Sequence, residues 1–252
     1  MIASKRVSVT GDEATTESTE ITNEIYFIHM KPTIKKSQLN SLVETMEFTL
    51  ISVIQGVALY FFINDTKDTI LTFRFEYWVY VLIAFIVLSM FWSQALVHVM
   101  SFISWPLEFV HMFLYFLVVT FEVLLFENIT NPSGWFFWNI FFFACVGLLY
   151  FVDFNLLRSK KSHFEHSELS LTFYSKLIIQ QKIGLYFLVP SGITFSFVAW
   201  LLLTRYPNFY FASHGHLIFG FLQLGVALVV LVFLLRTFKS HFGYIEAIRE
   251  MD

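Results

Sequence analysis

The stretch WFFWNIFFFACVGLLYFV, residues 135–152, decides the fold class. It carries no charge, and its apolar and polar residues do not alternate. A strand of a membrane β-barrel alternates over about ten residues, whereas a spanning helix needs about 20 mostly apolar residues to cross about 30 Å of hydrocarbon. The stretch therefore predicts a membrane-spanning helix.

The whole chain has the same apolar character. Of its 252 residues, 57% are hydrophobic, only 14% are charged, and 33 are Phe. Soluble domains carry about 25% charged residues and rarely expose large apolar patches. The single cysteine, Cys145, excludes an intrachain disulfide framework and a multi-cysteine metal site, and a net charge of −3 gives no electrostatic basis for binding nucleic acid. The composition predicts an integral, multi-pass membrane protein in contact with the lipid bilayer.

Six apolar segments are long enough to span, which predicts an all-α polytopic fold. We expect the spans at about 46–63, 77–99, 106–126, 135–157, 183–204 and 217–235. Three regions follow from this assignment. Residues 1–40 are expected to form a polar, largely disordered segment, 41–240 a six-helix transmembrane domain, and 241–252 a short cytoplasmic tail.

The basic residues predict the orientation. Thirteen of the 16 Lys and Arg residues fall in the N-terminal region, in the 158–182 connection or in the C-terminal tail, which share one side in a six-span topology. Only Lys67, Arg74 and Arg205 fall on the other side. Basic residues are retained in the cytoplasm. Both termini are therefore expected to be cytoplasmic.

The first span carries a polar stripe that continues into an apolar one. Thr45, Thr49, Ser52 and Gln55 lie close to one helix face, and Leu59 and Phe62 extend that face outward. A pore helix with a hydrophobic constriction has this pattern. A helix–helix contact surface of small residues has the same pattern, because small residues let two helices approach closely, and Gly56 lies on this face. Both interpretations stay open.

Ionisable residues gather near the two ends of the predicted bundle. Their positions predict acidic vestibules for cations or a proton relay, whereas an alternative is that they reach the lipid headgroups or pair with one another. The vestibule or proton-linked candidates are Glu44, Glu47, Glu108, His111, Glu122 and Asp153. Glu108 and His111 have the spacing of half a di-iron helix motif, but the other half is missing, so no metal site is predicted.

The layout of the chain resembles a known family. Phe91-Trp92-Ser93-Gln94-Ala95-Leu96-Val97-His98, followed by the run from Trp105 to Phe116, is similar to the second hairpin of the six-helix bacterial relatives of the endolysosomal potassium channels. The resemblance covers roughly residues 40–236 and implies an oligomer whose first span lines the pore. The Arg and Phe-Ser-Asp signature of that family's first span is absent, and residues 42–49 read LVETMEFT instead.

These observations predict a homo-oligomeric channel for inorganic cations, potassium among them, with the first span as pore helix. One alternative is a non-transporting subunit or sensor that binds a partner through 158–182. Another is a membrane redox protein that uses His98 and His111. No nucleophile motif, zinc motif, phosphate loop or dinucleotide fingerprint occurs, so neither an enzyme nor a bound cofactor is expected.

Overall fold

The computed structural model describes residues 36–100, 109–164 and 168–249, all within one unit that begins at Lys36. Most of the predicted polar segment 1–40 lies outside these residues. Every secondary-structure element in the described part of the chain is helical. Six segments are long and apolar enough to span a membrane, which confirms the all-α polytopic fold: Phe48–Leu71, Phe75–Ala95, Val110–Glu127, Pro132–Ser159, Glu168–Arg205 and His216–Tyr244.

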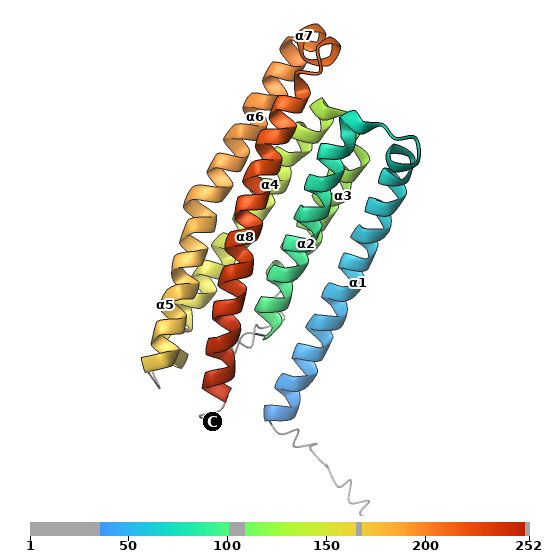
Figure 1. Ribbon diagram of the computed structural model, residues 1–252. Helices are drawn as coiled ribbons and strands as arrows, with labels where there is room; N and C mark the ends of the chain where they lie inside the picture. Colours follow the sequence, from blue (N-terminus) through green and yellow to red (C-terminus); the bar gives the residue numbers. More distant parts are fainter. Residues whose placement is uncertain (1–35, 101–108, 165–167, 250–252) are drawn as a thin grey trace, which may run out of the picture. The chain divides into compact units, whose positions relative to one another are not determined.

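The long helices account for most of the chain, and short helical turns connect several of them. In chain order the elements are α1 (Lys36–Leu71), the 3₁₀ turn η1 (Phe75–Tyr77), α2 (Trp78–Met100), α3 (Phe109–Glu127), α4 (Pro132–Ser159), the 3₁₀ turn η2 (Lys161–Phe164), α5 (Glu168–Ile183), the π turn η3 (Gly184–Leu188), α6 (Val189–Arg205), α7 (Pro207–Ala212) and α8 (His216–Arg249). We call the end at which α1 begins and α8 ends the inner end, and the opposite end the outer end (Figure 1).

The first and last helices are longer than the hydropathy pattern predicted. Helix α1 continues eight residues past the expected end at residue 63, through the polar sequence NDTKDTIL. Thr66 and Thr72 donate their hydroxyl hydrogens to the carbonyls of Phe62 and Asp68, at 2.6 and 2.5 Å. The Thr66 bond lies within α1, whereas Thr72 lies just past the helix end and bonds back to its last turn. Both hydroxyls are thus satisfied by helix carbonyls, so these polar residues are compatible with the helical segment.

The region expected to be a cytoplasmic connection, 158–182, is mostly helix. It contains the end of α4, η2 and almost all of α5, and α5 continues through η3 into α6. Pro190 lacks the N–H that would bond the carbonyl of Tyr186, and the π turn lies directly before it. A proline and a π turn are both known causes of a helix bend, and both lie at the junction of α5 and α6.

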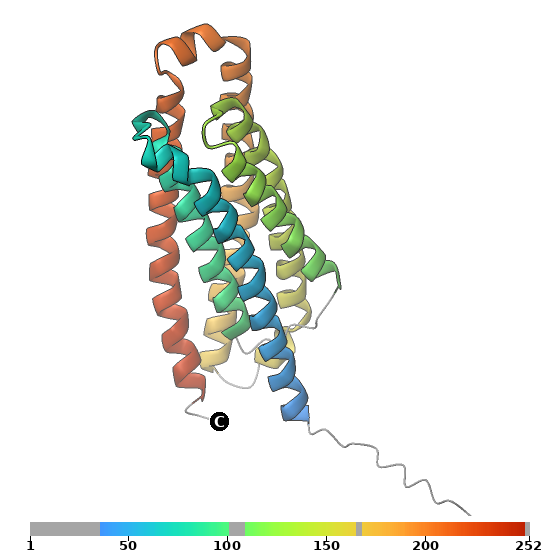
Figure 2. The ribbon, with the colours of Figure 1, turned by 90° about the vertical axis from the view of Figure 1, so that its right-hand side faces the viewer.

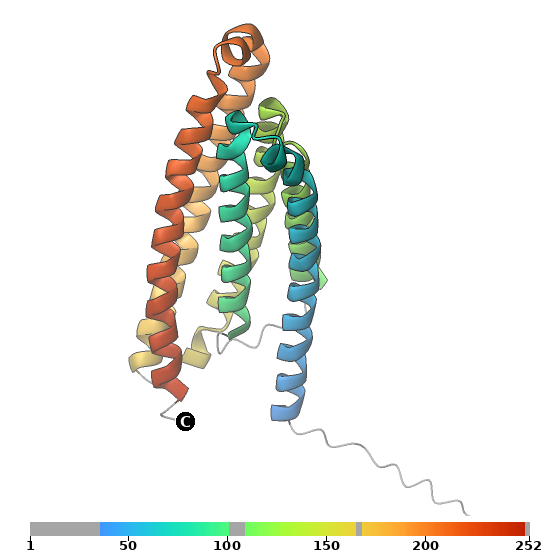
Figure 3. The ribbon, with the colours of Figure 1, turned by 45° about the vertical axis from the view of Figure 1, so that its right-hand side comes forward.

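The closest helix pairs form an arc in the order α8, α2, α1, α3, α4, α6. Figures 2 and 3 show these helices running along one common direction. At the inner end α5 packs on α4 and α8, where Leu157, Phe164, Phe173 and Leu177 form a small apolar cluster. At the outer end α7 connects α6 to α8.

An aromatic core holds the outer half of the arc together. Tyr80 of α2 packs edge-on against Trp135 of α4, with ring centroids 5.5 Å apart, and donates a hydrogen bond to the carbonyl of His216. Trp135 lies in the first turn of α4. Asn131 caps this helix by accepting a hydrogen bond from the Gly134 N–H. Large apolar side chains face outward elsewhere, among them Val229 of α8 at 70% exposure. In a bilayer these side chains contact lipid.

Candidate functional site

One face of α3 carries a column of buried polar side chains. His111, Tyr115 and Glu122 are four and seven residues apart, a spacing that returns each one to nearly the same side of the helix. Helix α3 packs between α1 and α4, so this face lies inside the bundle. Tyr115 and Glu122 are buried and His111 is half-buried. The spacing in the sequence predicts this shared face with Glu108 as a fourth member, and Glu108 lies outside the described residues.

Glu122 is the most unusual member of the column. Its exposure is 0%, and neither carboxyl oxygen has a hydrogen-bond partner among the described residues. Its neighbours along the helix, Val118, Val119, Leu125 and Phe126, are buried and apolar. The sequence analysis expected Glu122 at an acidic mouth. The structure corrects that expectation, because inward packing of this α3 face removes the carboxyl group from the surface entirely.

The middle of the column is formed by α1 and α3 together. Gln55 of α1 lies beside the Tyr115 hydroxyl, but the geometry falls short of a hydrogen bond. Neither carboxamide atom of Gln55 nor the Tyr115 hydroxyl has a hydrogen-bond partner in the described part of the chain. Buried polar groups are normally paired with protein or with ordered water. This region therefore offers three polar atoms to a water molecule or an ion.

At the inner end the column contacts α4. His111 Nδ1 lies 3.3 Å from Asp153 Oδ1, and the Asp153 side chain is almost completely buried. The pair is ionic when His111 is protonated. The sequence placed both residues near the cytoplasmic end but paired His111 with Glu108, which lies outside the described residues. The partner that the structure shows comes from the neighbouring helix.

The predicted pore-lining stripe on α1 divides between two environments. Thr45, Thr49 and Leu59 are exposed on the bundle surface, and Ser52 is half-buried. Gln55 and Phe62 are buried within the protomer. These two residues are seven apart at one edge of the stripe, and the packing of α1 against α2 and α3 covers that edge. The six residues therefore do not form one surface, which corrects the expectation of a single lining face.

The burial of Phe62 has a clear cause in its aromatic neighbours. Its ring centroid lies 5.4 Å from that of Phe126 in α3 and 6.2 Å from that of Phe85 in α2. Aromatic pairs at these distances add about 0.5–1.5 kcal/mol beyond the burial of their area. Phe62 thus serves the contact between three helices.

Several predicted residues cannot be placed in the site. The backbones of Glu44 and Glu47 belong to α1 and that of His98 to α2, but their side chains lie outside the described residues. The redox alternative therefore keeps only His111 within the described set, and there it contacts Asp153.

His241 is a buried polar residue near the inner end that was not among the predicted site residues. His241 was assigned to the cytoplasmic tail, but it is 2% exposed within α8, and its ring packs edge-on against Phe173 of α5. The signal was present in the sequence, because Phe238 and Phe242 place aromatic rings three residues before it and one after it. These residues extend the apolar character of α8 beyond residue 235.

Comparisons with protein-family models, with curated proteins and with solved structures find no match to this chain. Its function is therefore argued from the buried column itself.

Proposed function

We propose that this integral membrane protein conducts protons or small cations along the α3 column. The observation that carries the proposal is the buried, unpartnered carboxyl group of Glu122. A carboxyl group inside a membrane bundle is costly, and such groups mark ion pathways and proton relays. A carboxyl that only stabilised the fold would be expected to have a hydrogen-bond or ionic partner.

The order of groups along the column suits a relay. Moving outward from the His111–Asp153 pair, Tyr115 follows about 6 Å along the helix axis and Glu122 about 10 Å further, at 1.5 Å per residue. The first gap is short enough for one bridging water. The second gap is apolar, and conduction requires that water enter between α1 and α3 there. The unpartnered atoms of Gln55 and Tyr115 supply the polar contacts that a buried water needs.

The test is proton flux into liposomes that contain the purified protein and a trapped pH-sensitive dye. We expect Glu122→Gln to reduce flux about tenfold or more, because glutamine keeps the size of the side chain but carries no exchangeable acid proton. Glu127→Gln is the matched control, because Glu127 lies on the same helix and is exposed. Equal flux in the wild type and in Glu122→Gln contradicts the proposal.

A second candidate is the cation pore at the axis of a homo-oligomer, which the family resemblance implies. The exposed part of the α1 stripe favours it: Thr45, Thr49, Gly56 and Leu59 lie on the protomer surface, where another copy can reach them. A Cβ added at Gly56 meets no atom within 4 Å, so this surface is open in the protomer. The family resemblance implies potassium conduction for this candidate in particular.

Two variants separate the candidates. In the oligomeric pore, Leu59→Ser hydrates the apolar constriction and raises flux of K⁺ and Na⁺, whereas Val57→Ser, also exposed but away from the stripe, does not. Gly56→Leu is expected to shift the protein to a monomer in a sizing measurement. A wild type that is already monomeric, with Leu59→Ser flux unchanged, excludes the pore and leaves the α3 column as the path.

A further inference from the structure

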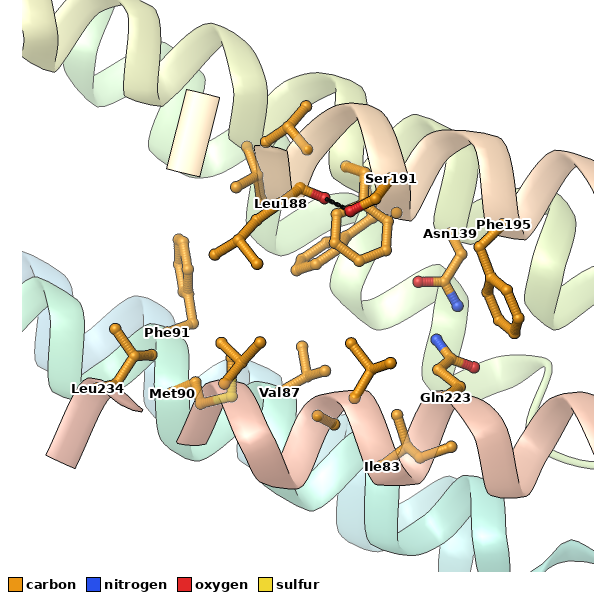
Figure 4. Close-up of a pocket in the computed structure, with 18 of the residues that line it drawn as sticks. Ile83, Val87, Met90, Phe91, Asn139, Leu188, Ser191, Phe195, Gln223 and Leu234 are labelled. Carbon is orange, nitrogen blue, oxygen red and sulfur yellow. Dashed lines mark hydrogen bonds between the residues drawn. The ribbon is translucent and has the colours of Figure 1, made fainter. Parts of the chain in front are cut away.

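A cavity of about 370 Å³ lies between the helix pairs α2–α8 and α4–α6, and no described residue of α3 lines it. Ligand pockets in proteins commonly measure about 300–1,000 Å³. Its walls are mainly Ile, Val, Leu, Met and Phe side chains (Figure 4). None of the described residues that line it carries a charge. Five of these lining side chains are polar: Gln94 and Tyr150 lie toward the inner end, Ser191 donates to carbonyls of its own helical segment, and two meet at the outer end.

Those two side chains are the carboxamides of Asn139 from α4 and Gln223 from α8. Figure 4 shows them pointing toward each other across the end of the cavity. Trp135 donates its indole N–H to Gln223 Oε1 at 2.8 Å, which leaves the Gln223 amino group as a donor facing Asn139. Asn139 is 2% exposed, and its Nδ2 has no hydrogen-bond partner among the described residues. The cavity therefore presents two N–H donors and lacks an acceptor between them.

The length of the cavity limits what fits there. Its lining runs along α8 from Gln223 to Leu234 and along α4 from Asn139 to Tyr150. Each interval is eleven residues, or about 16 Å of helix. An occupant thus has an acceptor oxygen at the outer end and an apolar body of about this length toward the inner end. Because the lining described here offers no charge, a neutral oxygen suits it better than a carboxylate or phosphate.

We propose that this cavity binds an uncharged, membrane-dissolved carbonyl compound, whose oxygen accepts hydrogen bonds from Asn139 and Gln223 and whose alkyl or isoprenoid chain fills the space between α2, α4, α6 and α8. An unpartnered buried amide costs stability, and a carbonyl oxygen removes that cost while the chain stays in an apolar environment. No described residue of the α3 column lines the cavity, although the ring of Phe91, which does line it, lies 4.8 Å from that of Tyr115. The uncharged lining does not suit a conducted ion.

The experiment compares two probes that differ in one group, methyl undecyl ketone and tridecane, added to the purified protein in detergent. Thermal unfolding is the readout, because a ligand that binds the folded state raises the melting temperature. We expect the ketone to raise it by about 2–4 °C more than the alkane, the shift produced by about one hydrogen bond in a chain of this size. Decylubiquinone forms a third arm, which distinguishes a quinone from an acyl carbonyl as the source of the oxygen.

The variant Asn139→Leu tests the donor. It removes an unpartnered buried amide without changing the side-chain size greatly, so the variant is expected to fold, and its ketone-specific shift is expected to vanish. Asn155→Leu, on an exposed position of the same helix, is the matched control and keeps the shift. Ala227→Phe places a ring in the cavity and is expected to abolish the response to every probe.

Two outcomes overturn the proposal. One is an equal response to ketone and alkane in the wild type, with no response to decylubiquinone. The other is an undiminished ketone-specific shift in Asn139→Leu. A larger shift with decylubiquinone than with the ketone supports the site and assigns it to a quinone, and the reverse assigns it to an acyl carbonyl.

Discussion

Replacing Glu122 by leucine is expected to make the protein more stable and less active at once. In the structure the carboxyl group has 0% exposure and no hydrogen-bond partner among the described residues. A buried polar group left unsatisfied costs about 1–3 kcal/mol, and leucine of similar size removes that cost. We therefore expect the free energy of unfolding to rise by about 1–3 kcal/mol in Glu122→Leu, while proton flux into liposomes falls to the level of empty vesicles.

The assay is reversible unfolding of the purified protein by increasing amounts of a denaturing detergent, followed by tryptophan fluorescence. Glu127→Leu serves as the control, because an exposed position away from the core changes stability by less than about 0.5 kcal/mol. A loss of more than about 1 kcal/mol in Glu122→Leu refutes the reasoning. Such a loss means that the carboxyl group has a stabilising partner and that its burial serves the fold.

Three further predictions concern orientation, close helix contacts and the inner ion pair. A cysteine at Ser133 is expected to react with an impermeant reagent added outside cells, and reaction only from the cytoplasmic side contradicts the orientation. Gly147→Ala is expected to destabilise the protein by about 1–3 kcal/mol, because the added Cβ would lie 2.8 Å from the Val189 side chain. Gly225→Ala, whose added Cβ meets no atom within 4 Å, is expected to stabilise the protein by about 0.5–1 kcal/mol. Equal effects of the two variants on the unfolding midpoint exclude this packing argument. A double-mutant cycle of His111→Ala and Asp153→Asn is expected to give a coupling energy of about 0.5–3 kcal/mol, and additive changes mean that the 3.3 Å contact contributes nothing.

The number and type of the spans were predictable from the sequence because hydrocarbon imposes a single demand. Every backbone polar group must be satisfied within the helix, so apolar length alone identifies a span. The ends were harder to predict. Helix α1 continues past Thr66 to Leu71, and the Thr66 hydroxyl bonds to the carbonyl of Phe62 within the helix, a bond that hydropathy does not register.

The partners within the site were not predictable, because they depend on which helix faces meet. The spacing of His111, Tyr115 and Glu122 predicts that they share one face of α3. Nothing in the sequence indicated that this face would meet α4 at Asp153, or that Asn139 would meet Gln223 across the cavity. Helices of similar hydropathy have many near-equivalent packings in lipid, and the choice among them lies in the shape of many side chains together.

The order of helices in the arc has a consequence for how the protein is made. Helix α2 packs against α8, which is synthesised four spans later, and α4 packs against α6. Consecutive hairpins therefore cannot complete the bundle one after another during synthesis. Until α8 is inserted, the α2 surface that carries Tyr80 has no α8 to pack against. The Tyr80 hydroxyl also lacks its acceptor, the carbonyl of His216. A nascent chain stopped after residue 205 is expected to remain with the insertion machinery or to be degraded, and release should follow only when α8 has entered the membrane.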